Sequence, residues 1–440
     1  MSIAALLCFL GALLLCLFTG WPVLLALGAG LICFALAVMR QGFSLRQVAA
    51  LCLSGIRTVG GLLLVLFSIG LLTGLWRGGG TIPFLLYYGV RLIAPPLFVL
   101  SLFLLCALMS YLTGSSFGTV GTMGFVCMLL ARLAGADTAA CAGAILAGCY
   151  VGDRGSPMSS AASLVATLTG TRLYDNVRAL RKSARLPLLI TCLFYLILSL
   201  ARPVQSVSPD LLEEMRQLFS LHPLALLPAV SVIVLCALRA PIYLNMLLSS
   251  SLALLLCLGI QKASLREALS WGIGGYAGAA GSPLAAVMNG GGVRSMLTGM
   301  GIVLLSSALF RLMDASGVLP RLQGLLQRLG NKTGVFGATL CAALLTSILS
   351  CSQTMAILLT HILCREQYDD PTALAVDLSN TAIVLSPLVP WNLACAIPLE
   401  TLGVGWSAIP YAMFLWLLPL YALPARRGDG RGDSTAAPPE

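Results

Sequence analysis

The fold is decided by the stretch LIAPPLFVLSLFLLCALMSYLTGSSFGTVGTMGFVCMLLA, residues 92–131, which holds 40 residues and no charged side chain. A transmembrane helix needs about 20 apolar residues to cross a bilayer, so this stretch is too long for one crossing. Its middle, Thr113-Gly114-Ser115-Ser116-Phe117-Gly118-Thr119-Val120-Gly121-Thr122, has three glycines and five hydroxyl side chains, a poor composition for an uninterrupted helix. Unwound backbone at membrane depth is tolerated only where it lines protein or a wet cavity, so we predict a broken helix here. A helix-packing face of small residues is the alternative.

The composition of the whole chain indicates the same class of protein. Of the 440 residues, 58% are hydrophobic and only 10% are charged, and the mean hydropathy is +0.96. An average soluble domain has about 25% charged residues, so a cytosolic enzyme, a secreted domain and a disordered chain are excluded. Charge-free windows along the chain predict an all-α polytopic membrane protein, with about ten transmembrane helices plus broken or re-entrant hairpins.

The net charge of +10 indicates how the protein is oriented in the membrane and does not indicate that it binds nucleic acid. Lys and Arg accumulate in the cytoplasmic loops of membrane proteins. Basic side chains cluster in residues 172–185 and again after the last apolar window, in residues 426–431. By contrast, residues 202–220 carry Asp210, Glu213 and Glu214 and suit the outside. We therefore predict that both termini lie in the cytoplasm.

The two halves of the chain resemble each other. Gly55-Ile56-Arg57 matches Gly292-Val293-Arg294 at an offset of 237 positions, and the same offset pairs Ser115 with Ser352. Each half also has a Ser-Leu-Arg element, which predicts an N-capped interfacial helix: Ser44-Leu45-Arg46-Gln47 and Ser264-Leu265-Arg266-Glu267. Ser156-Pro157 is paired with Ser386-Pro387 at an offset of 230, which requires a shorter loop in the second half. If an odd number of crossings separates the copies, they are inverted, as in secondary transporters that bind their substrate between the repeats.

We divide the chain into five segments on this basis. They are an N-terminal helical hairpin (1–40), a first repeat (41–201), an external loop with a second helical hairpin (202–261), a second repeat (262–424) and a disordered cytoplasmic tail (425–440).

The candidate binding residues lie in the polar breaks. Asp153 and Arg154 are a charged pair between two apolar windows. Placing such charges in lipid costs free energy, so each needs a partner or water. The alternative is a loop at the membrane surface in which both charges are solvated. Pro387 and Pro390 indicate a second broken helix, with a plain proline kink as the alternative. The candidate ion- or substrate-binding residues are Ser115, Ser116, Thr119, Asp153, Ser156, Ser160, Ser163, Ser352, Gln353, Asp377, Asn380, Ser386 and Asn392. The acids that remain as candidates for ion coupling are Asp153, Asp314, Asp377 and Glu400.

Several of these motifs, taken in order, resemble the NhaC-type Na+/H+ antiporter family of the ion transporter superfamily. They are Gly78-Gly79-Gly80-Thr81-Ile82-Pro83, Tyr87-Tyr88-Gly89, residues 113–122, Gly152-Asp153-Arg154-Gly155-Ser156-Pro157 and Ser386-Pro387-Leu388-Val389-Pro390-Trp391-Asn392. The resemblance implies a multi-pass protein of the prokaryotic inner membrane, with inverted repeats and tip loops. It also implies Na+ and H+ as coupled ions, with some relatives exchanging organic acids such as malate and lactate.

The chain departs from the family pattern at two acidic positions. The family usually has Ser-Asp-Thr-Thr-Asn after the first Ser-Pro pair, where this chain has Ser159-Ser160-Ala161-Ala162-Ser163. It commonly has Asp where Asn380 stands. An antiporter needs a group that binds either the cation or a proton, usually a carboxylate near the membrane midplane. Asp153, and with it Asp377, would therefore carry this competition, unless the coupling has changed.

We predict a secondary transporter working by alternating access, in which Na+ and H+ compete for Asp153. The alternative is an ion-coupled or exchange transporter of a small organic acid or amino acid, because Ser160, Ser163, Asn380 and Asn392 suit a polar substrate. A membrane scaffold gains nothing from broken helices, and no nucleophile–base pair indicates an enzyme. No cofactor and no transition-metal site is expected, since the chain has two histidines and no Cys-x-x-Cys pair. The partners expected are lipid and the transported ions, with a homodimer as an open option.

Overall fold

The computed structural model describes residues 2–204, 209–278, 283–317 and 334–425, and these form helices and no β-strand. Tyr276 and Gly290 form an isolated two-residue bridge. The predicted disordered tail lies outside the described residues, apart from Ala425. The all-α polytopic membrane fold is confirmed.

The first half begins with the predicted N-terminal helical hairpin, whose two helices are separated by Gly20-Trp21-Pro22. Its helices α1 and α2 pack through Phe9 and Phe34, whose ring centroids are 6.5 Å apart. The helices of the first half are α1 (Ser2–Thr19), α2 (Val23–Met39), α3 (Leu45–Thr58), α4 (Gly60–Gly78), α5 (Thr81–Leu92), η1 (Pro95–Leu97), α6 (Phe98–Thr113), α7 (Ser116–Thr119), the π-helical turn η2 (Val120–Gly124), α8 (Phe125–Leu133), α9 (Thr138–Gly155), α10 (Ser160–Thr169) and α11 (Leu173–Ala201).

The second half continues on the other side of the acidic loop. Its described helices are α12 (Pro209–Leu218), η3 (Pro223–Leu226), α13 (Leu227–Ala237), α14 (Ile242–Gly259), α15 (Leu265–Gly274), α16 (Pro283–Met288), α17 (Gly292–Ser295), α18 (Leu297–Ala315), α20 (Val335–Ser350), α21 (Gln353–Cys364), η4 (Arg365–Gln367), α22 (Pro371–Asn380), α23 (Ala382–Leu385), η5 (Ser386–Leu388), α24 (Leu393–Leu402), η6 (Trp406–Tyr411) and α25 (Met413–Ala425).

Among the described residues, six helices are long and apolar enough to cross a membrane, and the number rises to eight if each bent helix pair is one span. The bends are 95° between α12 and the η3–α13 segment and 49° between residues 371–388 and α24. Four shorter apolar helices, α1, α2, α20 and α25, are additional. The second bend confirms the break predicted at 386–392, because residues 389–392 belong to no helix and a plain kink would leave the helix continuous.

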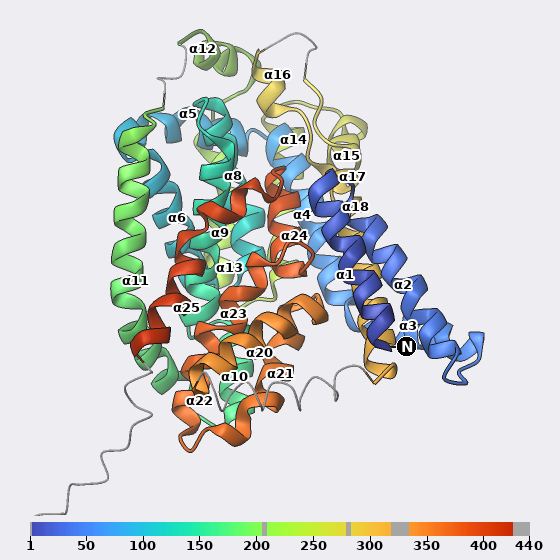
Figure 1. The fold of residues 1–440 in the computed structure, drawn as a ribbon. Helices are drawn as coiled ribbons and strands as arrows, with labels where there is room; N and C mark the ends of the chain where they lie inside the picture. The colour runs from blue at the N-terminus through green and yellow to red at the C-terminus, as the bar shows by residue number, and fades with distance from the viewer. Residues whose placement is uncertain (1, 205–208, 279–282, 318–333, 426–440) are drawn as a thin grey trace, which may run out of the picture.

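The outer surface is apolar where it would meet lipid. On α11, Leu189, Leu193 and Ile197 are exposed at helical spacing, and only 22% of the apolar window of this helix is buried. Such a stripe would promote aggregation in water but is the expected lipid-facing surface of a membrane helix. Figure 1 places the N-terminal end of α1 and the C-terminal end of α25 toward the side of α10 and α22, away from α12 and α16.

The helix bounds repeat between the two halves. α4 and α18 each have 19 residues, and α6 and α20 each have 16 residues. The members of each pair are 237 positions apart, as the sequence comparison predicts. Both predicted N-caps are confirmed too, because Ser44 and Ser264 each form a capping box with the residue three positions later. The hydrogen bonds from Ser264 to Glu267 lower the pKa of the Glu267 carboxyl.

The predicted offset of 230 for the last part of the repeat is wrong. α9 and α22 begin 233 positions apart, each capped by an aspartate, Asp137 and Asp370. α10 and α24 have ten residues each and also lie 233 positions apart. The second half is therefore four residues shorter before α22, and the two Ser-Pro pairs are out of register by three. In the corrected register, Ser386 occupies the position of Asp153.

Candidate functional site

Asp153 lies near the C-terminal end of α9 and is buried, with 4% of its surface exposed. Its Oδ2 atom accepts hydrogen bonds from Ser116 Oγ at 3.2 Å and from Gln353 Nε2 at 3.1 Å. Ser159 Oγ lies 3.3 Å from Oδ1. A buried carboxylate needs such donors to offset its lost hydration. The solvated surface loop considered for this residue is therefore wrong.

The two donors to Oδ2 occupy equivalent positions in the two halves. Ser116 begins α7 and Gln353 begins α21, and they are 237 positions apart. Both helices follow a break, so each donor sits on the first residue after unwound backbone. We call these two breaks, residues 113–116 and residues 350–353, the tips of the repeats. The structure thus brings the tip of each repeat to one oxygen atom of Asp153.

The backbone at the two tips also matches. Gly114 and Cys351 both adopt the left-handed conformation, with φ of 64° and 53°, and the serines that follow them have φ of −141° and −142°. Gly114 is required in the first tip, since a Cβ there would lie 2.3 Å from the carbonyl carbon of Met158. Cys351 is one of three described non-glycine residues with positive φ. Its carbonyl accepts a 2.9 Å hydrogen bond from Leu393 N, which joins the two breaks of the second half.

Arg154 is also buried, with 2% of its surface exposed, but it serves another network. Successive helical residues point about 100° apart, so it projects away from Asp153. Arg154 Nε donates to Asn380 Oδ1 at 3.0 Å, and Nη2 donates to the same oxygen and to Ser183 Oγ at 2.8 Å. The guanidinium thereby connects α9 to α11 and α22. Asn380, a predicted ion ligand, is engaged by Arg154.

Asp377 belongs to a further hydrogen-bond chain and is 1% exposed. Tyr368 Oη donates to Asp377 Oδ2 at 2.9 Å, and Thr339 Oγ1 lies 2.8 Å from the same Tyr368 hydroxyl. The chain links α20, the loop before α22 and α22 itself. Asp377 is thus a buried acid near the second repeat, as predicted, although its tyrosine partner was not.

We expect Tyr368→Phe to lower the free energy of unfolding by about 1–3 kcal/mol, because the buried carboxylate loses a donor while the ring is kept. Thermal denaturation of the purified protein in detergent measures this. Tyr421→Phe, at a half-exposed tyrosine of α25, is the matched control and should leave the melting temperature unchanged. Equal melting temperatures for Tyr368→Phe and wild type would show that this hydrogen bond does not stabilise the fold.

Other predicted site residues shape the breaks. Ser115 caps α7 by accepting from Gly118 N at 3.1 Å, and Thr119 Oγ1 donates to the Ser115 carbonyl at 2.8 Å. Ser156 Oγ donates to the Tyr111 carbonyl at 2.6 Å. These hydroxyls have backbone partners, and their observed contacts hold the tips in shape.

Three polar residues of the second half contact one another, among them Ser386 at the position equivalent to Asp153. Ser386 Oγ lies 3.1 Å from Ser347 Oγ. Asn392 Nδ2 donates to the Ser347 carbonyl at 2.9 Å, and Asn392 Oδ1 accepts from Ala394 N and caps α24. Where the first half has a carboxylate, the second half therefore has a neutral hydroxyl.

The structure does not bring Ser160 and Ser163 to Asp153, because both are exposed on α10. Asp314 is exposed at the end of α18. Ser352 makes no side-chain cap and lines a cavity of about 240 Å³, together with Ser306 and Arg311 of α18. The Ser306 hydroxyl is buried and has no hydrogen-bond partner within the described part of the chain.

Sequence reasoning missed Ser159, Ser183 and Tyr368 as partners of the buried charges. Ser159 could have been found, since it stands where an N-cap precedes α10. Ser183 lies in the basic stretch of α11, and Tyr368 lies in a polar loop nine residues from Asp377. Neither position has a local pattern that indicates its distant partner.

The chain is similar to known transporters along most of its length. A sequence model described as the Na+/H+ antiporter family matches residues 1–162 and 148–426. A malate-2H+/Na+-lactate antiporter of Bacillus subtilis is 28% identical over 92% of this chain and 86% of its own length. The Na+/H+ antiporter NhaC of Alkalihalophilus pseudofirmus is 27% identical over 82% and 80%, respectively. An arginine/ornithine antiporter of Halobacterium salinarum is 28% identical over 82% and 77%.

Proposed function

Because the chain belongs to the Na+/H+ antiporter family, we propose that it exchanges Na+ for H+ and that Asp153 is the group that binds either ion. It is a multi-pass membrane transporter and not an enzyme. The proposed location is the prokaryotic inner membrane with both termini in the cytoplasm, and the proposed assembly is a homodimer. The N-terminal end of α1, the C-terminal end of α25 and the start of α11, which carries most of the basic residues of 172–185, lie toward one side of the molecule, in support of this orientation (Figure 1).

The observation that carries the proposal is the set of polar groups that contact the Asp153 side chain. Its carboxylate is buried and contacts a hydroxyl from α7, a second hydroxyl from Ser159 and the amide of Gln353. Hydroxyl and carboxylate oxygens are suitable ligands for a small hard cation, and the amide can rotate to present its own oxygen. A proton on the same carboxylate would remove the charge that attracts the cation. One group can therefore hold one ion or the other.

The proposed transport step is alternating access at the junction of the two repeats. Asp153 Oδ2 binds one donor from each repeat, so a relative movement of the tips changes its coordination. The 240 Å³ cavity that Ser352 lines gives space for water beside the second tip. We propose that Ser116, Ser159 and Gln353 form the ion site with Asp153. In this scheme the hydrogen bonds of Arg154, including those to Asn380, hold α9, α11 and α22 together and take no part in ion binding.

Exchange of a small organic acid or amino acid is the second candidate. It is favoured by the relative named as a malate-2H+/Na+-lactate antiporter, which aligns with 92% of this chain. The amide and hydroxyl groups around Asp153 suit a polar organic molecule as well as a cation.

Proteoliposomes containing only the purified protein test both candidates. With an imposed pH gradient reported by a trapped pH-sensitive dye, addition of Na+ should dissipate the gradient, while empty liposomes should hold it. A gradient that survives Na+ contradicts the antiport proposal. Uptake of labelled malate, lactate or arginine into the same vesicles, driven by an outward gradient of its partner, would support the second candidate instead.

A further inference from the structure

A cavity of about 500 Å³ lies between α24, α18 and the turn that joins α1 to α2. This volume is typical of small-molecule sites, which range over about 300–1,000 Å³. No residue that contacts the Asp153 carboxylate lines it. The cavity is therefore a separate feature of the molecule.

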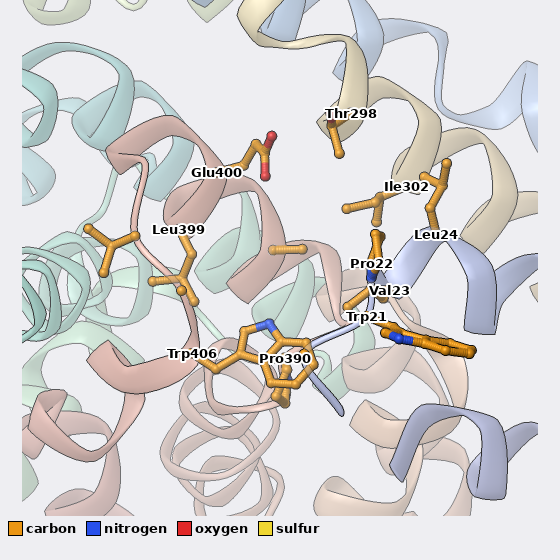
Figure 2. A pocket seen from close by; sticks show the side chains of 14 residues that line it. Trp21, Pro22, Val23, Leu24, Thr298, Ile302, Pro390, Leu399, Glu400 and Trp406 are labelled. Carbon is orange, nitrogen blue, oxygen red and sulfur yellow. The ribbon is translucent and has the colours of Figure 1, made fainter. Parts of the chain in front are cut away.

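Glu400 supplies the one ionisable side chain among the residues lining the cavity. It is partly buried, and within the described residues no hydrogen bond or ion pair to its carboxylate is observed. The nearby Arg132 is occupied, because its Nη2 atom donates to the carbonyls of Leu402 and Gly403 at 2.7 and 3.1 Å. Figure 2 shows Glu400 projecting from α24 into the space that α18 borders with Thr298.

The remaining walls are apolar and aromatic. Trp406 and Trp21 lie on either side of Pro22 in Figure 2, with the Trp21 ring directed away from Trp406, and Ile302 and Leu399 add aliphatic surface. Indole faces attract organic cations through their ring quadrupole, and the attraction increases when the cation is desolvated. A negative charge without a protein partner, at one end of a cavity that two indoles and aliphatic side chains also line, is complementary to a cation with an apolar body. It is poorly complementary to a strongly hydrated inorganic ion.

We propose that this cavity binds an ammonium group carried on an apolar body, with Glu400 as its counter-ion and Trp21 and Trp406 as its walls. The same chemistry is offered by a free hydrophobic amine and by the ammonium headgroup of phosphatidylethanolamine. The ligand would lie between α18 and α24, where the second repeat meets the helices of the N-terminal hairpin. This proposal does not depend on Na+/H+ exchange by the protein.

Isothermal titration with phenyltrimethylammonium, using delipidated full-length protein in detergent, tests the site. Wild type should bind the cation saturably. Glu400→Gln keeps the side-chain shape and should weaken binding by at least about tenfold, which corresponds to 1.4 kcal/mol. Asp175→Asn removes the same charge from an exposed position of α11 and should bind as wild type does. Trp406→Leu keeps Glu400 and should weaken binding several-fold, so the test survives if Glu400→Gln does not fold.

Nanodiscs separate the two sources of the ligand. If phosphatidylethanolamine competes with phenyltrimethylammonium and phosphatidylglycerol does not, the headgroup is the occupant. If neither lipid competes, the occupant is a free amine. Absence of saturable binding to wild type overturns the proposal. Equal binding by wild type and Glu400→Gln overturns it as well.

Discussion

Asp153→Asn is expected to abolish Na+-driven proton exchange, with a fall of at least about 100-fold in the initial rate, because an amide carries neither the charge nor the exchangeable proton. The substitution keeps the size of the side chain, and with its amide oxygen in the Oδ2 position it can still accept from Ser116, while its amide nitrogen can donate to the Ser159 hydroxyl. The loss would therefore be chemical and not a result of misfolding. The measurement is Na+-induced dissipation of a pH gradient in proteoliposomes.

Two further variants make this experiment decisive. Asp153→Glu restores the carboxylate one methylene further along and should recover part of the exchange. Asp175→Asn, at an exposed acid that contacts Arg178 at 4.0 Å, should exchange ions at the wild-type rate. Wild-type exchange by correctly folded Asp153→Asn would remove Asp153 from the mechanism, and the acid of the Tyr368–Asp377 chain would become the next candidate.

The corrected repeat register explains why one carboxylate is expected to suffice. Asp153 and Ser386 occupy equivalent positions, so the second repeat presents a hydroxyl where the first presents an acid. Ser386 contacts Ser347 and the Ala382 carbonyl. The second repeat instead sends Gln353 across to Asp153. The pseudo-symmetric structure thus supports an asymmetric site.

Much of this architecture could be predicted from local composition. The break at residues 113–116 is visible because glycine and hydroxyl residues interrupt an apolar window that is too long for one crossing. The break at 386–392 is visible because two prolines remove backbone donors. For Asp153, the apolar windows on both sides indicated a place at membrane depth but left a solvated surface loop open. In each case the signal lies within a few residues of the feature.

The rest depended on contacts between distant residues. That Asn380 accepts from Arg154, 226 positions earlier, cannot be derived from the surroundings of either residue. Ser160 and Ser163 were expected at the site because a family motif runs through them, but the helical rotation of α10 turns both outward. The offset of 230 was wrong because Ser-Pro pairs are short motifs, whereas helix bounds and aspartate caps define the register over whole elements.

Close packing between α6 and α9 positions Asp153. Gly148 and Gly152 of α9 form a G-x-x-x-G pattern that lets two membrane helices approach closely. A Cβ on Gly152 would lie 2.1 Å from the carbonyl carbon of Ser110 and 2.3 Å from Tyr111 N, and a Cβ on Gly148 would lie 2.6 Å from the Phe103 carbonyl oxygen. These obstructing atoms are backbone, so no side-chain rotation can relieve the contact.

Gly152→Ala is therefore expected to push α9 away from α6 at a cost of at least about 3 kcal/mol, the upper end of the usual overpacking penalty. For a chain of 440 residues this corresponds to a fall of about 3 °C or more in melting temperature. The displacement also moves Asp153, the next residue, relative to Ser116, so exchange should fall in whatever fraction of the protein stays folded. Thermal denaturation and proteoliposome assays on the same preparation measure the two effects.

Gly155→Ala is the matched control on the same helix, because a Cβ there would meet nothing within 4 Å. It adds the same methyl group and the same change in helix propensity three residues away, and should keep the wild-type melting temperature or raise it slightly. If both variants melt alike, the α6–α9 contact has room to adjust and close packing does not position Asp153. If only Gly152→Ala melts early, the methyl group acts through its contact with α6, and the backbone of Ser110 sets where the Asp153 carboxylate lies.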